Sequence, residues 1–145
     1  MDHFYQDISG WWDDKDRHFY GEIVNEFPSG SHFVEVGSFK GRSSACMAVE
    51  IINSDKDIKF DCVDTWTGSV EHQKGENSED ADVVNGTMFD VFLENTSKVS
   101  NVINPIRMPS TQAAPLYEAN SLDFVFIDGA HDFENVLNDI RSWVP

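Results

Sequence analysis

The sequence predicts an α/β fold, a parallel β-sheet with flanking helices, and two observations carry this prediction. Segments typical of strands and segments typical of amphipathic helices alternate along the chain, which is the pattern of parallel strands joined through helices. The stretch from Leu122 to Ile127 is almost wholly apolar, as expected for a parallel strand buried on both faces.

A length of 145 residues favours a single domain. We divide it into an N-terminal helical segment, residues 1–30, and a core, residues 31–145. Hydrophobic residues make up 40% of the chain and aromatic residues 12%, which is enough to fill a core and excludes a chain that is disordered throughout.

The first helix can be capped by Asp13 or Asp14 and ends near Phe27. Further helices are expected over residues 43–52, 88–95, 110–117 and 133–143, and strands over residues 33–36, 58–63, 102–107 and 122–127. The apolar positions of the last helix are Phe133, Val136, Leu137, Ile140 and Trp143.

The third strand contains Pro105, which cannot donate a hydrogen bond to a neighbouring strand, so this strand is expected at an edge of the sheet. With right-handed crossovers, the predicted strand order is 3-2-1-4. The polar and acidic stretch from Gly68 to Asn85 is predicted to be a long loop, and a loop of this length is expected to be a mobile lid or substrate loop.

The turn after the first strand has the pattern acidic-x-Gly-x-x-x-Gly, formed by Glu35, Gly37 and Gly41. Glycine turns that lead from a strand into a helix are where α/β proteins bind nucleotides, although a plain tight turn is the alternative. The dinucleotide pattern G-x-G-x-x-G is absent because Phe39 stands two positions after Gly37, which disfavours an NAD-binding oxidoreductase.

Other polar residues follow the strands at the same edge of the predicted sheet. Asp64 ends the second strand, where a carboxylate can accept both hydroxyls of a ribose; a turn-forming role is the alternative. Ser110 follows the third strand and could instead cap a helix. Asp128 and His131 follow the fourth strand, with a helix cap and an exposed loop histidine as their alternatives.

These motifs together resemble the class I S-adenosylmethionine (SAM)-dependent methyltransferases. The glycine turn is similar to their first motif, and the segments FIDGAHDFENV (residues 126–136) and DTWTGS (residues 64–69), the latter followed by Glu71-His72, resemble the small-molecule O-methyltransferases of methyltransferase family 24. The resemblance implies a Rossmann-like fold and SAM as cofactor. The residues it implies for SAM are Glu35, Gly37, Ser38, Gly41, Ser43, Asp64, Thr65, Ser110 and Asp128.

The same resemblance implies that His131 is the general base and that Asp128 faces SAM and, in metal-dependent relatives, binds Mg²⁺. Methyl transfer to a hydroxyl requires the oxygen to lose its proton, and a histidine that titrates near neutrality suits that role. The expected function is therefore O-methylation of a small molecule, a sugar or a secondary metabolite, and the alternative is a SAM- or nucleotide-binding domain without turnover.

The sequence departs from the family at its end, since strands 5 to 7 and the further metal ligands of the relatives are missing. The metal assignment thus rests on Asp128 alone. The fourth strand would have an unpaired outer edge with Asp123 as the one charge in the run, and we expect the chain to self-associate there or to be markedly less stable than a full-length version.

Charge and composition exclude several partners. With 26 acidic against 10 Lys and Arg residues, the formal net charge of −16 disfavours binding to nucleic acids and to anionic membranes. No signal peptide and no membrane-spanning run is recognised, which predicts a cytoplasmic protein. Cys46 and Cys62 lie in apolar surroundings and are predicted to be reduced core thiols.

Overall fold

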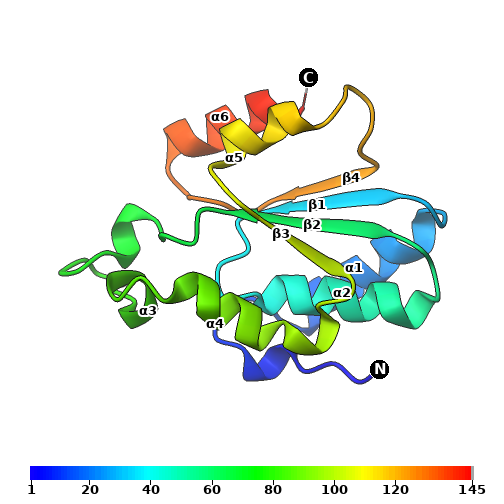
Figure 1. The fold of residues 1–145 in the computed structure, drawn as a ribbon, viewed down its shortest axis with the longest axis horizontal. Helices are drawn as coiled ribbons and strands as arrows, with labels where there is room; N and C mark the ends of the chain where they lie inside the picture. Colours follow the sequence, from blue (N-terminus) through cyan, green and yellow to red (C-terminus); the bar gives the residue numbers. More distant parts are fainter. Residues whose placement is uncertain (145) are drawn as a thin grey trace.

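The computed structural model describes residues 1–144 and contains one four-stranded parallel sheet. Its strands are β1 (His32–Val36), β2 (Lys59–Asp64), β3 (Ile103–Arg107) and β4 (Phe124–Ile127). They lie in the order β3-β2-β1-β4, as predicted, with β1 paired to both β2 and β4 (Figure 1). The prediction of a Rossmann-like α/β fold is confirmed.

Pro105 lies on the edge strand β3, where it stands opposite Cys62 of β2. This position agrees with the expectation from its missing N–H group, because an edge strand needs donors on one side only.

Helices cover both faces of the sheet (Figure 1). One face carries α1 (Asp14–Glu26), α2 (Arg42–Ser54) and α4 (Met88–Asn95), and the other carries α5 (Ser110–Ala113) and α6 (Phe133–Trp143). The shorter elements are α3 (Ala81–Val84) and the 3-10 helices η1 (Tyr5–Asp7), η2 (Val70–His72), η3 (Ser97–Val99) and η4 (Ala114–Leu116).

Each face of the sheet has its own apolar core because successive strand residues point to opposite sides. Phe33 and Phe60 belong to the core with α1 and α2, whereas Val34 and Val63 pack with Trp143 on the side of α6. Cys46 and Cys62 are buried and unpaired, and burial raises the pKa of the Cys46 thiol to about 12.

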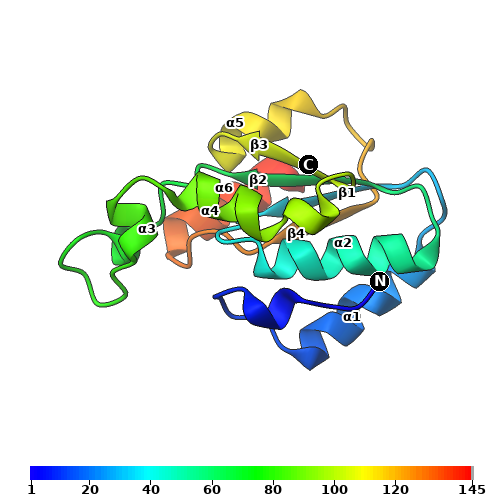
Figure 2. The same ribbon diagram turned by 60° about the horizontal axis from the view of Figure 1, so that its bottom comes forward.

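The N-terminal segment packs against α2, as the turned view in Figure 2 shows. Asp13 caps α1 in a reciprocal arrangement: its side chain accepts from the backbone of Lys15 and Asp16, and the Asp16 side chain accepts from the backbone of Asp13. The predicted start of this helix is confirmed.

The segment from Gly68 to Asn85 is more ordered locally than the predicted loop, because it contains η2 and α3. It is tied to the glycine turn by Lys40, whose Nζ lies 2.8 Å from Asp80 and 2.6 Å from Asp82. Partial burial lowers the pKa of Lys40, but hydrogen bonds and attraction from the two carboxylates outweigh this effect and raise the pKa above its usual value.

One expectation about the C-terminal part is wrong. All four residues of β4 are only half-buried, not buried on both faces, because no described residue pairs with the outer edge of this strand. The helix α6 buries Asp139 and Trp143, whereas Phe133 is 80% exposed and Ile140 46%. Within residues 1–144, no helix has the length and apolar character needed to cross a membrane.

Candidate functional site

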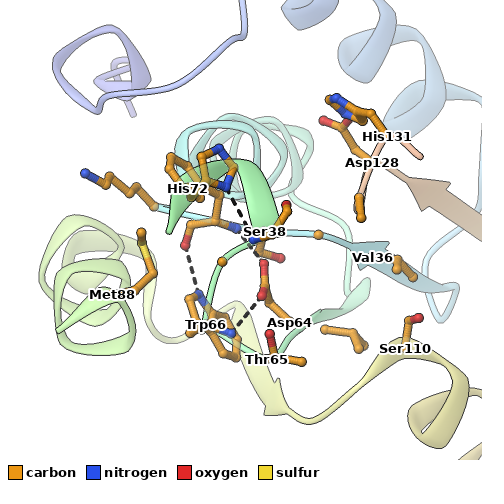
Figure 3. Close-up of a pocket in the computed structure, with 18 of the residues that line it drawn as sticks. Val36, Ser38, Asp64, Thr65, Trp66, His72, Met88, Ser110, Asp128 and His131 are labelled. Atoms are coloured by element: carbon orange, nitrogen blue, oxygen red, sulfur yellow. Dashed lines mark hydrogen bonds and ion pairs between the residues drawn. The ribbon is translucent and has the colours of Figure 1, made fainter. Parts of the chain in front are cut away.

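A cavity of about 640 Å³ opens at the carboxyl ends of β1, β2 and β4, where ligands bind in parallel sheets. Its wall includes all but two of the residues that the sequence suggested for SAM: Gly37, Ser38, Ser43, Asp64, Thr65, Ser110 and Asp128 line it. His131 lines it as well (Figure 3). The two exceptions are Gly41, which lies in the same turn at the start of α2, and Glu35.

The two glycines of the turn have left-handed backbone conformations, with φ of +90° at Gly37 and +87° at Gly41. They also allow close packing: a Cβ atom at Gly37 would lie 2.2 Å from the backbone oxygen of Asp128, and one at Gly41 would lie 2.7 Å from Thr96 Cγ2. Glycine at position 37 therefore lets the ends of β1 and β4 approach each other, and glycine at position 41 lets the turn pack against the end of α4.

Glu35 lies beneath the cavity and is fully buried. Its carboxylate accepts hydrogen bonds from the hydroxyls of Tyr20 at 3.3 Å, Ser38 at 2.9 Å and Ser44. Burial raises the pKa of Glu35, and the neighbouring serine hydroxyls oppose this shift in part. Glu35 does not line the cavity itself but orients the hydroxyl of Ser38, which does.

Asp64 connects β2 to the glycine turn. One carboxylate oxygen accepts from Phe39 N at 2.9 Å and the other from Trp66 N at 2.7 Å. Both Phe39 and Trp66 have positive φ, 46° and 51°, a conformation that costs free energy in residues other than glycine. The Trp66 indole also donates to the backbone oxygen of Phe39 at 2.9 Å, so Asp64 and Trp66 hold the turn in place.

Ser110 is not the cap of α5, because Pro109 occupies that position. Its hydroxyl instead donates to the carboxylate of Asp139, which is 5% exposed and also lines the cavity. Asp139 was not predicted as a site residue. The signal that could have indicated it is an acidic residue between the apolar positions of the last helix.

Asp128 and His131 lie together at one side of the cavity, with 3.5 Å between His131 Nε2 and Asp128 Oδ1 (Figure 3). Asp128 does not cap α6, since Asp132 does so by accepting from the backbone of Asn135. The side chains are 43% and 74% exposed, so both can reach a ligand in the cavity. Among residues 1–144 no three His, Cys, Asp or Glu side chains gather as a metal site.

The wall on the other side of the glycine turn is aromatic and was not predicted. It contains Trp11 from the N-terminal segment, Phe39 from the turn and His72 from η2. His72 was noted in the sequence only because Glu71-His72 belongs to the segment that resembles methyltransferase family 24. Trp11 was not noted because a single exposed tryptophan gives no periodic pattern.

The comparison with protein families identifies the chain. Residues 34–145, most of the chain, match the sequence profile of a methyltransferase domain. The chain belongs to this methyltransferase family. The predicted resemblance to methyltransferase family 24, a group with the class I SAM-dependent fold, is thereby confirmed.

Solved methyltransferases share the fold. A Klebsiella pneumoniae protein assigned as an O-methyltransferase superposes with a TM-score of 0.62 at 18% identity, covering 94% of this chain and 54% of its own. A Staphylococcus aureus protein assigned as a caffeoyl-CoA O-methyltransferase gives 0.61 at 16% identity, covering 97% and 55%. The cofactor-bound Rv0187 from MTB gives 0.59 at 13% identity, covering 91% and 52%.

A curated relative is also similar along almost the whole chain. It is an uncharacterised protein, y4gI, of Sinorhizobium fredii, 24% identical over 144 residues, which are 99% of this chain and 14% of the relative. The methyltransferase chain therefore spans about half the length of the solved structures and a seventh of this relative.

Proposed function

We propose that this methyltransferase domain binds SAM and transfers its methyl group to a hydroxyl of a small molecule, a sugar or a secondary metabolite. One observation carries the proposal: a single cavity is bordered by the Asp64-locked glycine turn on one side and by the Asp128–His131 pair on another. A nucleotide-like ligand and a proton acceptor would thus meet in one place.

The residues of the turn would hold the cofactor. Asp64 accepts one backbone hydrogen bond on each carboxylate oxygen, and each oxygen retains a further acceptor site that would be available to ribose hydroxyls. At the far end of the cavity, Ser110 and Asp139 offer acceptors for the amino group of an adenine ring. Bound SAM supplies an electrophilic methyl group on a sulfonium centre.

His131 would accept the proton of the attacking hydroxyl through Nδ1, since Nε2 faces the Asp128 carboxylate. Asp128, next to it, stabilises the imidazolium that forms and orients the ring. The cavity wall aligns the acceptor oxygen with the methyl group, which is the other contribution that a protein makes to such a transfer.

Magnesium is a separate part of the proposal, and the residues present do not fit a complete site. Asp128 is the only candidate ligand from the sequence, and the described residues add no cluster around it. We therefore assign no step to a metal, and a comparison of activity with Mg²⁺ and with a chelator tests whether one is needed.

Calorimetry with SAM, S-adenosylhomocysteine and NAD tests the cofactor. We expect SAM and S-adenosylhomocysteine to bind and NAD not to bind. The Asp64→Ala variant should bind SAM about ten- to a hundredfold more weakly, since a charge-assisted hydrogen bond contributes about 1.5–3 kcal/mol. Asp90→Ala, an exposed change on α4, is the control. An unchanged affinity in Asp64→Ala would contradict the placement.

Transfer of a labelled methyl group to a panel of hydroxylated small molecules tests the reaction. Turnover supports the methyltransferase assignment. Binding of SAM without turnover on any acceptor supports the alternative, a SAM-binding domain without catalysis.

A further inference from the structure

The aromatic wall contains a tryptophan that the fold does not bury. Trp11 is 78% exposed and faces the cavity from the N-terminal segment. A large apolar side chain in water at the rim of a cavity, next to other rings, is typical of a surface that a ligand covers.

The segment that carries Trp11 is fixed to the start of α2. Arg42 donates from Nε to the backbone oxygen of Trp12 at 2.9 Å and from a terminal nitrogen to that of Ile8 at 2.7 Å. Its guanidinium also lies 5.7 Å from the centre of the Tyr5 ring. Trp11 is therefore held beside the glycine turn although its own side chain is exposed.

The three rings of the wall lie next to one another with their planes inclined by 28–37°. The planes of Trp11 and His72 differ by 28° with centres 6.5 Å apart, and those of Phe39 and His72 differ by 32° with centres 5.2 Å apart. Ser69 N donates to His72 Nδ1 at 3.3 Å, so the neutral imidazole carries its proton on Nε2. His72 is thus oriented by the loop while Trp11 offers a free ring face.

The cations of the cavity are already occupied. Lys40 is paired with Asp80 and Asp82, and Arg42 is bound to backbone oxygens. The carboxylates that line the cavity are Asp64, Glu71, Asp128 and Asp139. An anionic acceptor would meet these carboxylates without a free positive partner, whereas a neutral or cationic acceptor would not be repelled.

We propose that the wall formed by Trp11, Phe39 and His72 binds the methyl acceptor by stacking, and that the acceptor is a hydroxylated ring that is uncharged or positively charged. The inference rests on the proposed function, because it names the substrate class of the same cavity. It disfavours phosphorylated acceptors and coenzyme A esters, whose anionic groups find no unpaired Lys or Arg among the cavity-lining residues of the described part of the chain, residues 1–144.

Ligand-observed NMR titration tests the wall without requiring turnover. The probes are catechol, dopamine and protocatechuate, which share the dihydroxylated ring and are neutral, cationic and anionic near pH 7. They are titrated into the protein saturated with S-adenosylhomocysteine. We expect catechol and dopamine to bind, and protocatechuate to bind at least about fivefold more weakly than dopamine.

Two variants assign the binding to Trp11. Stacking between aromatic rings contributes about 0.5–1.5 kcal/mol, so Trp11→Ala should weaken catechol binding about two- to tenfold, while Trp11→Phe retains most of it. The affinity for S-adenosylhomocysteine should not change in either variant. Catechol binding that is absent in the parent protein or equal in Trp11→Ala overturns the proposal, as does equal binding of protocatechuate and dopamine.

The two proposals fail in different ways. If S-adenosylhomocysteine does not bind to the parent protein, the proposed function is wrong, and the same probes titrated into the ligand-free protein still decide whether the wall binds rings. If S-adenosylhomocysteine binds and the probes do not, only the acceptor class is wrong.

Discussion

At the scale of single residues, Glu35 is an acidic group that the fold keeps out of water. Its carboxylate depends on three hydroxyl donors from Tyr20, Ser38 and Ser44. A buried acid of this kind lowers the stability of the fold, but it also fixes the positions of the polar groups around it, which is useful where those groups shape a binding site.

The raised pKa of Glu35 predicts a pH dependence of stability. A carboxyl group whose pKa is higher in the folded than in the unfolded protein stabilises the fold at low pH, and this contribution is lost as the pH rises through the folded-state value. The melting temperature of Glu35→Gln relative to the parent should therefore increase between about pH 4.5 and pH 7.

Thermal unfolding of both proteins across this range measures the difference, and Glu94→Gln, an exposed change on α4, is the control. A difference that is constant with pH, or that shrinks as the pH rises, would be inconsistent with a raised pKa.

His131 is the residue on which the chemistry depends. The His131→Ala variant should lower the rate of methyl transfer by about a hundredfold or more, because general base catalysis contributes on that order, while SAM binds as before. Rates under saturating SAM, together with calorimetry, measure both quantities. Full turnover in the variant would remove His131 from the mechanism.

The residues predicted from the sequence were those with a fixed place in the topology. Gly37, Asp64, Ser110 and Asp128 follow the four strands, and parallel strands bring such residues to one edge. Trp11 was missed because the N-terminal segment reaches the cavity through Arg42, a tertiary contact that leaves no pattern in the sequence.

At the scale of elements, few polar side-chain contacts hold the segment from Gly68 to Asn85 to the rest of the protein. Its ion pairs from Lys40 to Asp80 and Asp82 connect it to the turn on which SAM would lie. Because the same segment supplies His72, its position affects the shape of the cavity.

We expect this segment to exchange its amide protons faster than any other internal part of the chain, as predicted from its length and glycines. In Lys40→Ala, exchange at Ser78 and Asp80 should accelerate about two- to tenfold, which corresponds to the loss of two partly exposed ion pairs. Hydrogen exchange followed by mass spectrometry measures it, with Lys15→Ala as control. Strong protection of residues 68–85 in the parent protein would disprove the prediction.

The elements themselves were predicted well where apolar periodicity was clear. The sequence did not indicate which side of α6 is buried. The sequence indicated one apolar side, but the helix packs with Asp139 and Trp143 inward. The hydrogen bond between Ser110 and Asp139 and the packing of Trp143 against Tyr117 decide this rotation, and both are contacts between distant segments.

At the scale of the whole molecule, the open side of the sheet lies along β4. Its residues are half-buried, and the exposed apolar residues Phe133 and Ile140 of α6 lie on the helix that covers it. Asp123 is the only charged residue in the run from Leu122 to Ile127, and its carboxylate is engaged because it accepts from the backbone N–H of His32 at 2.8 Å.

We therefore propose that the 145-residue chain self-associates through β4 and the adjoining face of α6, with a second copy as the partner. The net charge of −16 opposes association at low salt, so the oligomeric fraction should rise with salt concentration. Size-exclusion chromatography with light scattering measures it.

The Ile140→Lys variant should lower the oligomeric fraction, whereas Leu93→Lys, an equally exposed site on α4, should not. A parent protein that is monomeric at high concentration and high salt would show that the edge is tolerated without a partner.

The position of His32 at the start of β1 sets an order in which the chain can assemble. It contacts Asp61 of β2, 29 residues later, and Asp123 beside β4, 91 residues later. Closing the longer loop costs about 1 kcal/mol more in chain entropy. During synthesis, β1, α2 and β2 can therefore pack as soon as they are made. We expect β4, which completes the cavity, to dock after these elements, so that the binding site forms later than the pairing of β1 with β2.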